Sequence, residues 1–125
     1  MDRKYEQPIK KIVKDLSKNK KVYSIFLFWS YLKNFGNLSD IDICIIGKLN
    51  ENEKKKILRD SPEKFDISFF EELPIFIKVR VFKDGKELFV RNKNKIEEIK
   101  SNTLKEYREF MFFMKNRMTE KFENA

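Results

Sequence analysis

Apolar residues recur along the chain at two different spacings, which predict helices and strands in alternation. Near the start, apolar positions 9, 12, 13 and 16 are separated by polar residues, a spacing that places them on one face of a helix over about 7–20. The next run, VYSIFLFW at 22–29, consists mostly of β-branched and aromatic residues. A run of this kind is typical of a strand that is buried on both faces.

The same two patterns alternate to the end of the chain. The runs SDIDICII at 39–46 and KFDISFF at 64–70 predict two further strands. In the last segment an apolar residue recurs about every third or fourth position, which predicts a long amphipathic helix. The predicted elements are a helix at 7–20, strands at 22–29 and 39–46, a helix at 50–59, a strand at 64–70, a helix at 73–82, a strand at 87–90 and a helix at 95–122.

This order of elements predicts an α+β fold of the layered type, in which a small mixed sheet of about four strands is flanked by helices. The length of 125 residues is that of one domain. We therefore expect a single domain over 1–125, with its core at about 8–91 and a long C-terminal helix at about 95–122.

Composition narrows the chemistry that this domain can carry out. The chain has no histidine and one cysteine, Cys44, so zinc hydrolysis, Ser-His-Asp catalysis and disulfide frameworks lack their residues. The net charge of +8 favours anionic partners, although a solvated lysine face is the simpler explanation, with local runs only at 18–21 and 54–56. Because no long apolar segment or secretory signal is seen, we expect a cytoplasmic protein without membrane contact.

The strand at 39–46 carries two aspartates that a purely structural strand would avoid. Asp40 and Asp42 stand two residues apart, so both side chains leave from one face while Ile41, Ile43 and Ile45 face the helices. Neighbouring carboxylates repel each other, and Mg²⁺ removes this conflict because it binds hard carboxylate oxygens. The alternative is that both carboxylates face solvent at the mouth of the strand.

A third aspartate occupies a comparable place in the strand at 64–70. Phe65, Ile67 and Phe69 share one face, so Asp66 uses the other. If this strand neighbours the strand of Asp40, three carboxylates converge and can hold the two metal ions of in-line nucleotidyl transfer. The alternative is an exposed aspartate on a half-solvated strand.

A serine follows the first strand at the start of the polar connector. The hydroxyl and the backbone N–H groups near Ser30 can hold a triphosphate if a short helix begins there. An ordinary helix N-cap is the alternative for the same residue.

Together these residues resemble a known signature. Trp29-Ser30 followed by Ser39-Asp40-Ile41-Asp42 is similar to the Gly-Ser…Ser-Asp-Ile-Asp motif of the DNA polymerase β nucleotidyltransferase superfamily, and its minimal nucleotidyltransferases (MNT domains) are the nearest in likeness. Asp66 matches the third carboxylate of that family, and the resemblance extends over roughly 22–91. Trp29 departs from the pattern, because it stands where the family has a glycine that lets backbone approach the phosphates.

The resemblance implies a polymerase β-like nucleotidyltransferase fold and a Mg²⁺-dependent transfer of a nucleoside monophosphate, AMP from ATP, to an acceptor hydroxyl. Asp40, Asp42 and Asp66 would bind two Mg²⁺ ions and catalyse the transfer, and Ser30 and Ser39 would contact the nucleotide. MNT antitoxins pair with helical HEPN toxins and adenylylate a toxin tyrosine, so a HEPN-type partner is expected.

Two other functions remain open from the sequence. Trp29 and the excess of apolar residues at 110–114 favour a protein-binding antitoxin or regulatory module that has lost catalysis. The same helix would then bind a partner or a second copy of the chain. Nucleic-acid binding through the basic surface has less support, because no nucleic-acid motif is present.

Overall fold

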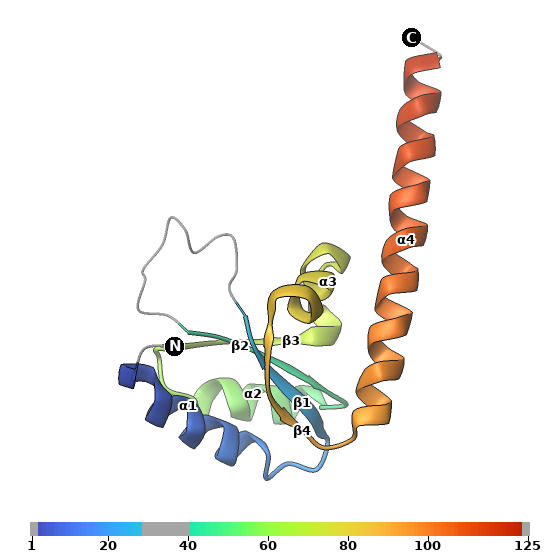
Figure 1. Ribbon diagram of the computed structural model, residues 1–125. Helices are drawn as coiled ribbons and strands as arrows, with labels where there is room; N and C mark the ends of the chain where they lie inside the picture. Colours follow the sequence, from blue (N-terminus) through green and yellow to red (C-terminus); the bar gives the residue numbers. More distant parts are fainter. Residues whose placement is uncertain (1–2, 29–40, 124–125) are drawn as a thin grey trace.

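A computed structural model of the chain describes residues 3–28 and 41–123. These residues form a four-stranded sheet with helices on both of its faces (Figure 1). The elements in chain order are α1 (Arg3–Leu16), β1 (Val22–Leu27), β2 (Ile41–Gly47), α2 (Glu51–Asp60), β3 (Phe65–Phe69), the 3-10 helix η2 (Phe70–Glu72), α3 (Ile75–Asp84), β4 (Lys86–Val90) and α4 (Lys93–Glu123). The predicted order of helices and strands is confirmed, and the sequence pattern did not indicate η2.

The sheet is mixed and has the strand order β3-β2-β1-β4. β1 pairs antiparallel with both β2 and β4, whereas β2 and β3 run parallel and are joined by the crossover helix α2. The starts of β2, β3 and β4 therefore lie at the same end of the sheet as the end of β1. We call this the carboxylate end, because Asp42 and Asp66 lie there.

Each face of the sheet has its own hydrophobic core. One face packs against α1 and α2, and the other packs against α3 and the start of α4. Ile43 of β2 belongs to the first core and Cys44 to the second, so the predicted alternation along this strand is confirmed. β1 also contributes to both cores, with Ile25 in the first and Phe26 in the second, as expected for a strand buried on both faces.

Helix α1 differs from its prediction at both ends. It begins at Arg3, so Pro8 lies inside the helix rather than in its first turn, and it ends at Leu16 rather than near residue 20. The following turn is held by its own side chains: the Ser17 hydroxyl donates to the Lys14 carbonyl oxygen. This local hydrogen bond competes with a further helical turn, which explains the earlier end.

Helix α4 is 31 residues long and extends well beyond the sheet (Figure 1). Its first turns are buried against the second core through Ile96 and Thr103. Further along, Phe110 meets Phe76 of α3 edge to face, with ring centroids 5.1 Å apart. Every side chain at 111–119 is exposed. No helix in the described part of the chain has the length and apolarity to span a bilayer.

Lys54 of α2 is a buried cation that the sequence did not reveal. It belongs to the lysine run 54–56, for which solvation was an open explanation, yet its side chain is only 8% exposed. Its Nζ lies 2.5 Å from Glu71 Oε1 and 3.0 Å from Glu72 Oε1, and it stands over the ring of Phe69. The two carboxylates raise the pKa of Lys54, so the ammonium group stays charged. This cluster ties the first turns of α2 to the end of β3.

Glu53 joins α2 to the turn after α1. It completes a capping box, because the Asn50 side chain accepts from Glu53 N at 2.8 Å and the Glu53 carboxylate accepts from Asn50 N at 3.1 Å. The same carboxylate accepts from Asn19 Nδ2 and Lys21 Nζ, each at 2.9 Å. The hydrogen bonds from Asn19, Lys21 and Asn50 lower the pKa of Glu53 to about 2.

We predict that acid weakens the fold through Glu53. Its pKa falls from 4.5 to about 2 on folding, so its contribution is present above pH 4.5 and is lost as the pH falls through 2. When the pH falls from 4.5 to about 2, the melting temperature of Glu53→Gln should therefore fall less than that of the wild type. Melting curves at successive pH values measure the difference, with the exposed Glu63→Gln as the control. Equal pH dependence of Glu53→Gln and the wild type would contradict the prediction.

Gly85 joins α3 to β4 through a close backbone approach. The helix ends there as expected, with Gly85 N donating to the Val81 carbonyl oxygen at 3.0 Å. Its φ is −77°, so no left-handed conformation requires the glycine. A Cβ at this position would instead overlap the Val81 carbonyl oxygen and lie 3.3 Å from the carbonyl oxygen of Leu27. Only glycine therefore lets α3 end this close to β1.

Replacing Gly85 by alanine should lower the free energy of unfolding by about 1–3 kcal/mol, because the backbone atoms around the new methyl group must move apart. Urea denaturation of Gly85→Ala measures this loss. The control Lys83→Ala, at an exposed position of the same helix, should stay within about 0.5 kcal/mol of the wild type. A Gly85→Ala variant as stable as the wild type would show that the turn relaxes without strain.

Candidate functional site

Two aspartates meet on neighbouring strands at the carboxylate end. Asp42 is the second residue of β2, Asp66 is the second residue of β3, and the two are register partners in the parallel pair. Partners in parallel strands present their side chains to the same face, and the strands lie about 4.8 Å apart. The expectation that these two strands are neighbours is confirmed, and both carboxylates leave from the face that α3 covers.

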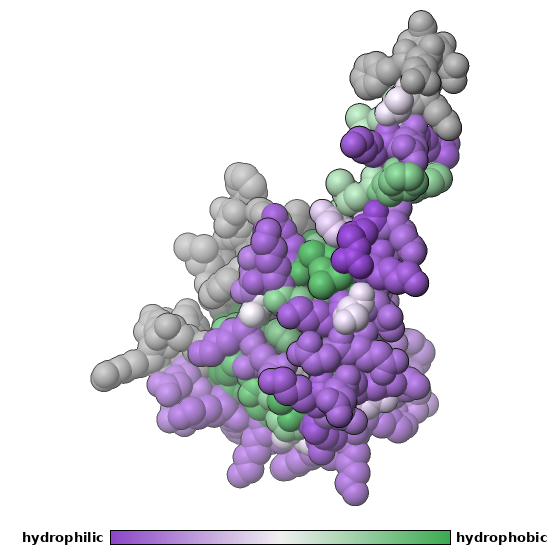
Figure 2. Space-filling model, turned by 45° about the vertical axis from the view of Figure 1, so that its right-hand side comes forward, coloured by the Kyte–Doolittle hydropathy of each residue, from purple (hydrophilic) through white to green (hydrophobic). Residues whose placement is uncertain are grey.

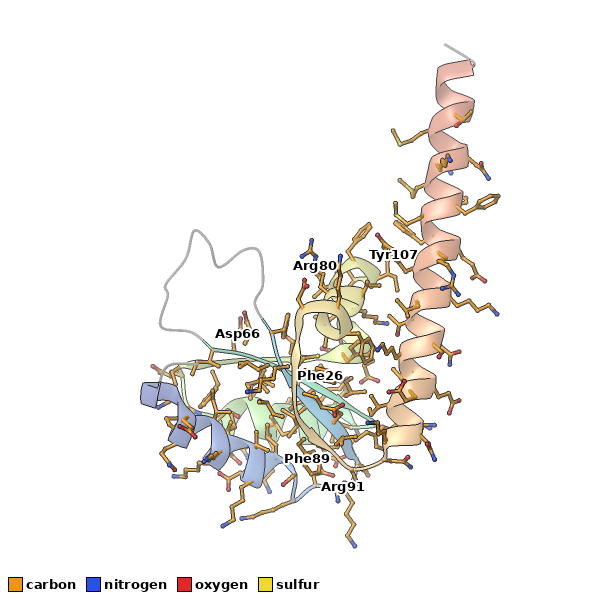
Figure 3. All side chains as sticks on the ribbon, viewed as in Figure 1. Phe26, Asp66, Arg80, Phe89, Arg91 and Tyr107 are labelled. Carbon is orange, nitrogen blue, oxygen red and sulfur yellow. The ribbon has the colours of Figure 1, made fainter. Side chains whose placement is uncertain are left out.

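The two carboxylates have different surroundings. Asp42 is 2% exposed and shares its face with Cys44 and Ile46 of the second core. Asp66 is exposed near the surface of the same end of the sheet (Figure 3). One carboxylate is thus placed by the core, and the other can be reached from solvent.

The backbone holds Asp42 from the β1 side and its neighbour Ile41 from the β3 side. Phe28 N donates to the Asp42 carbonyl oxygen at 3.2 Å, and Ile41 N donates to the Lys64 carbonyl oxygen at 2.8 Å. A site built on a central strand in this way keeps its geometry better than a site on loops.

The donor set of this pair fits a hard divalent cation. Mg²⁺ is commonly bound through one or two carboxylates, and its other positions are taken by water and substrate phosphates. Within residues 3–28 and 41–123, no group of three His, Cys, Asp or Glu side chains could hold a metal ion. Asp42 and Asp66 are the pair that would hold Mg²⁺, and two carboxylates meet its requirement.

Four of the predicted residues lie outside the described part of the chain. They are Trp29, Ser30, Ser39 and Asp40. Three predictions therefore stay untested: Asp40 as a metal ligand, the contacts of Ser30 and Ser39 to the nucleotide, and the position of the Trp29 ring.

Basic residues that the sequence analysis did not single out lie at the same end of the sheet. Lys86 begins β4 and pairs with Leu27 at the end of β1. Arg80 lies one turn before the end of α3, above the face that carries Asp66 (Figure 3), and its Nη1 is 3.1 Å from Asp84 Oδ2. Lys86 shares the face of its partner Leu27, which belongs to the first core, so only Arg80 lies on the face that carries the carboxylates. The net charge was the only sequence signal for Arg80, because its place depends on how α3 packs on the sheet.

Cys44 takes no part in the chemistry of this site. It lies two residues after Asp42 on the same face and is fully buried. Burial raises the pKa of its thiol to about 12, so the thiolate needed for nucleophilic attack or metal binding does not form near neutral pH.

A hollow of about 670 Å³ lies elsewhere in the described chain. It is formed between α1 and α2 and is lined by residues that include Ile12, Asn19 and Ile57. These helices cover the face of the sheet opposite Asp42 and Asp66. The hollow therefore does not contribute to the carboxylate site.

Comparison with known proteins identifies the class to which this fold and site belong. Residues 10–94 match the family described as polymerase beta, nucleotidyltransferase. This match covers more than half of the 125 residues. The chain therefore belongs to the polymerase β nucleotidyltransferase family.

A relative from Methanocaldococcus jannaschii carries the name of a protein adenylyltransferase. It is 44% identical to this chain over 70 residues, which make up 55% of this chain and 57% of the relative. The matched part thus spans little more than half the length of that protein.

Solved structures share the fold at low sequence identity. One is a chain in the complex of a tri-AMPylated HEPN toxin with an MNT antitoxin from Shewanella oneidensis, with a TM-score of 0.68, 20% identity and coverage of 96% of this chain and 98% of that chain. Another is a chain in a toxin–antitoxin structure with AMP-PNP, with a TM-score of 0.61, 21% identity and coverage of 92% and 96%.

We predict that Asp42→Asn weakens Mg²⁺ binding by more than about tenfold, because even residues outside the first coordination shell commonly contribute that much to metal affinity. Without metal the variant should melt at the same temperature as the wild type or slightly higher, because a like-charge repulsion is removed. Melting curves in EDTA and in millimolar Mg²⁺ separate the two effects.

The control is Asp15→Asn, which removes an exposed carboxylate of α1. It should keep the rise in melting temperature that Mg²⁺ gives the wild type. If Asp42→Asn lost several kcal/mol of stability in EDTA, Asp42 would be a structural residue rather than a metal ligand.

Proposed function

We propose that this chain is a Mg²⁺-dependent nucleotidyltransferase that transfers AMP from ATP to a hydroxyl group of a partner protein. The observation that carries the proposal is the register pairing of Asp42 with Asp66 in a chain of the polymerase β family. Family membership supports nucleotidyl transfer. The name of the Methanocaldococcus jannaschii relative supports a protein as the acceptor.

Each carboxylate has a role that matches its surroundings. Asp42, placed by the core, would hold Mg²⁺ together with Asp40 and Asp66. Mg²⁺, when bound, would neutralise phosphate oxygens and orient the α-phosphate for in-line attack. Asp66 is exposed, so it can also reach the acceptor hydroxyl and draw away its proton.

The transfer itself exchanges one bond to phosphorus for another. The acceptor oxygen bonds to the α-phosphorus of ATP, the bond from that phosphorus to the β-phosphate oxygen breaks, and pyrophosphate leaves. Ser30 and Ser39 would bind the phosphates, as the family resemblance implies. Arg80 places positive charge on the face of the sheet that carries Asp66, which favours binding of the triphosphate.

The acceptor that we propose is a tyrosine of a HEPN-type toxin, which makes the chain an antitoxin. Chains in toxin–antitoxin complexes share its fold over almost their whole length, and one of those complexes contains an AMPylated toxin. The second candidate is a catalytically degenerate antitoxin or regulatory module that acts by binding alone. Trp29, in place of the family glycine, and the exposed apolar residues of α4 favour this candidate.

The experiment incubates the protein with Mg²⁺, a purified HEPN-type protein from the same organism, and ATP labelled on either the α- or the γ-phosphate. We expect the α-label to appear on a tyrosine of the HEPN-type protein and the γ-label to leave with pyrophosphate. Asp66→Asn should slow labelling by about 100-fold or more, because proton transfer from the acceptor is lost. Asp15→Asn is the control and should label at the rate of the wild type.

The second candidate predicts a different result. A degenerate antitoxin would bind the HEPN-type protein and leave it unlabelled at every ATP concentration. Rapid labelling by Asp66→Asn would instead show that the transfer does not depend on this carboxylate.

A further inference from the structure

The part of α4 that extends beyond the sheet is apolar and exposed. We call residues 111–119 the α4 arm. Figure 2 shows it as a projection with hydrophobic side chains above a mostly hydrophilic body. The exposed fractions of its large apolar residues are 45% for Met111, 69% for Phe112, 55% for Phe113, 38% for Met114 and 55% for Met118.

The arm continues the stripe by which α4 packs on its own sheet. Ile96 and Thr103 of that stripe are buried by the domain, and Phe110 makes its last ring contact with α3. Met114 and Met118 follow at the same helical spacing on the same side of the helix. The apolar stripe thus continues beyond the part of the described domain that packs against it. An exposed apolar stripe of this kind is typical of a helix that takes part in an interface.

The arm is also apolar outside that stripe. Residues 111–114 are consecutive and stand 100° apart, so they surround the helix. A flat surface could cover one side only, whereas a groove between helices covers several. Methionine adapts its shape to such a groove more readily than branched residues do. A partner with a helical groove therefore fits the arm better than a partner with a flat surface.

The charge of the arm indicates whether it binds a different protein or a second copy of this chain. The arm carries Lys115 and Arg117 and no carboxylate at 111–119, and Arg117 stands over the Phe113 ring. The whole chain has a net charge of +8, so two copies would bring like charges together. An acidic partner would instead be attracted.

The arm and the carboxylates can face the same partner. Phe110 contacts Phe76 near the start of α3, so the stripe lies on the side of α4 that faces α3. The far end of α3 leads to Gly85 and the carboxylate end of the sheet. Figure 3 draws α3 between α4 and Asp66, so a protein docked on the stripe would extend across α3 to bring its hydroxyl to Asp66.

We infer that the α4 arm is the docking surface for the acceptor protein, an acidic α-helical protein whose apolar groove takes the arm while its hydroxyl reaches Asp66. This inference rests on the proposed function. The arm supplies affinity and partner choice, and the carboxylates supply the chemistry.

The test compares Met118→Glu with Leu58→Glu. Both residues are large and apolar, with exposed fractions of 55% and 52%, but Leu58 lies on α2. The probe is the same purified HEPN-type protein as in the labelling experiment, and titration calorimetry measures its affinity. Met118→Glu should bind it about 30-fold more weakly or worse, the loss of a hot-spot residue, while Leu58→Glu binds like the wild type. Both variants should keep the wild-type melting temperature and affinity for Mg²⁺–ATP.

Labelling with α-labelled ATP separates this inference from the proposed function. If the wild type binds the probe through the arm without labelling it, the docking surface stands and the nucleotidyl transfer is wrong. If Met118→Glu binds and labels the probe like the wild type, the transfer stands and the docking surface is wrong. Absence of any binding to the probe also overturns the docking surface.

Sedimentation equilibrium tests whether a second copy of the chain binds the α4 arm. The wild type alone should be monomeric at micromolar concentration. A dimer that Met118→Glu dissociates and Leu58→Glu does not would assign the arm to a second copy of the chain and overturn the inference.

Discussion

The parallel register of β2 and β3 is the constraint on which the site depends. Side chains alternate between the two faces of a strand, so a slip of one residue would move Asp66 into the core beneath α1 and α2. Ile43 and Ile67 are register partners and are both buried in that core, which makes the slip unfavourable. The apolar residues thus place the carboxylates although they touch no substrate.

The crossover helix α2 connects β2 to β3, so its position affects this register. Polar side chains of α2 bind the segments on both sides of it. Glu53 binds the turn after α1, and Lys54 binds the two glutamates of η2 at the end of β3. A buried ion pair is weak evidence for stability, because desolvation of the charges offsets their attraction. The contacts of Lys54 with Glu71 and Glu72 do link α2 to η2. We interpret the Lys54 cluster as a device that specifies how the crossover packs.

Rigidity and recognition are divided between two parts of the molecule. Asp42 lies on β2, a central strand whose backbone is held from both sides, and Asp66 lies on the edge strand β3, whose register is set by β2. The α4 arm carries exposed Met and Phe side chains on a helix of which only the first half packs against the domain. Such an arrangement lets partner choice change by substitutions in the arm without disturbing the register of the sheet.

The order of the elements, the alternation along β2 and β3, and the faces that Asp42 and Asp66 use could be predicted from the sequence, because they follow from spacing within a single segment. The sequence did not determine the early end of α1, since a local hydrogen bond from Ser17 competes with the helix there. Ser30, Ser39 and Asp40 remain predictions, because they lie outside the described residues.

Only the packing of the whole chain made β2 and β3 neighbours, and so made two aspartates far apart in the sequence register partners. It also decided that Lys54 is buried while its neighbours in the lysine run are exposed, and that the domain covers only the first half of the α4 stripe. The physical reason is common to all three. Periodicity specifies which face of an element is apolar, whereas burial and pairing depend on what other segments bring against that face.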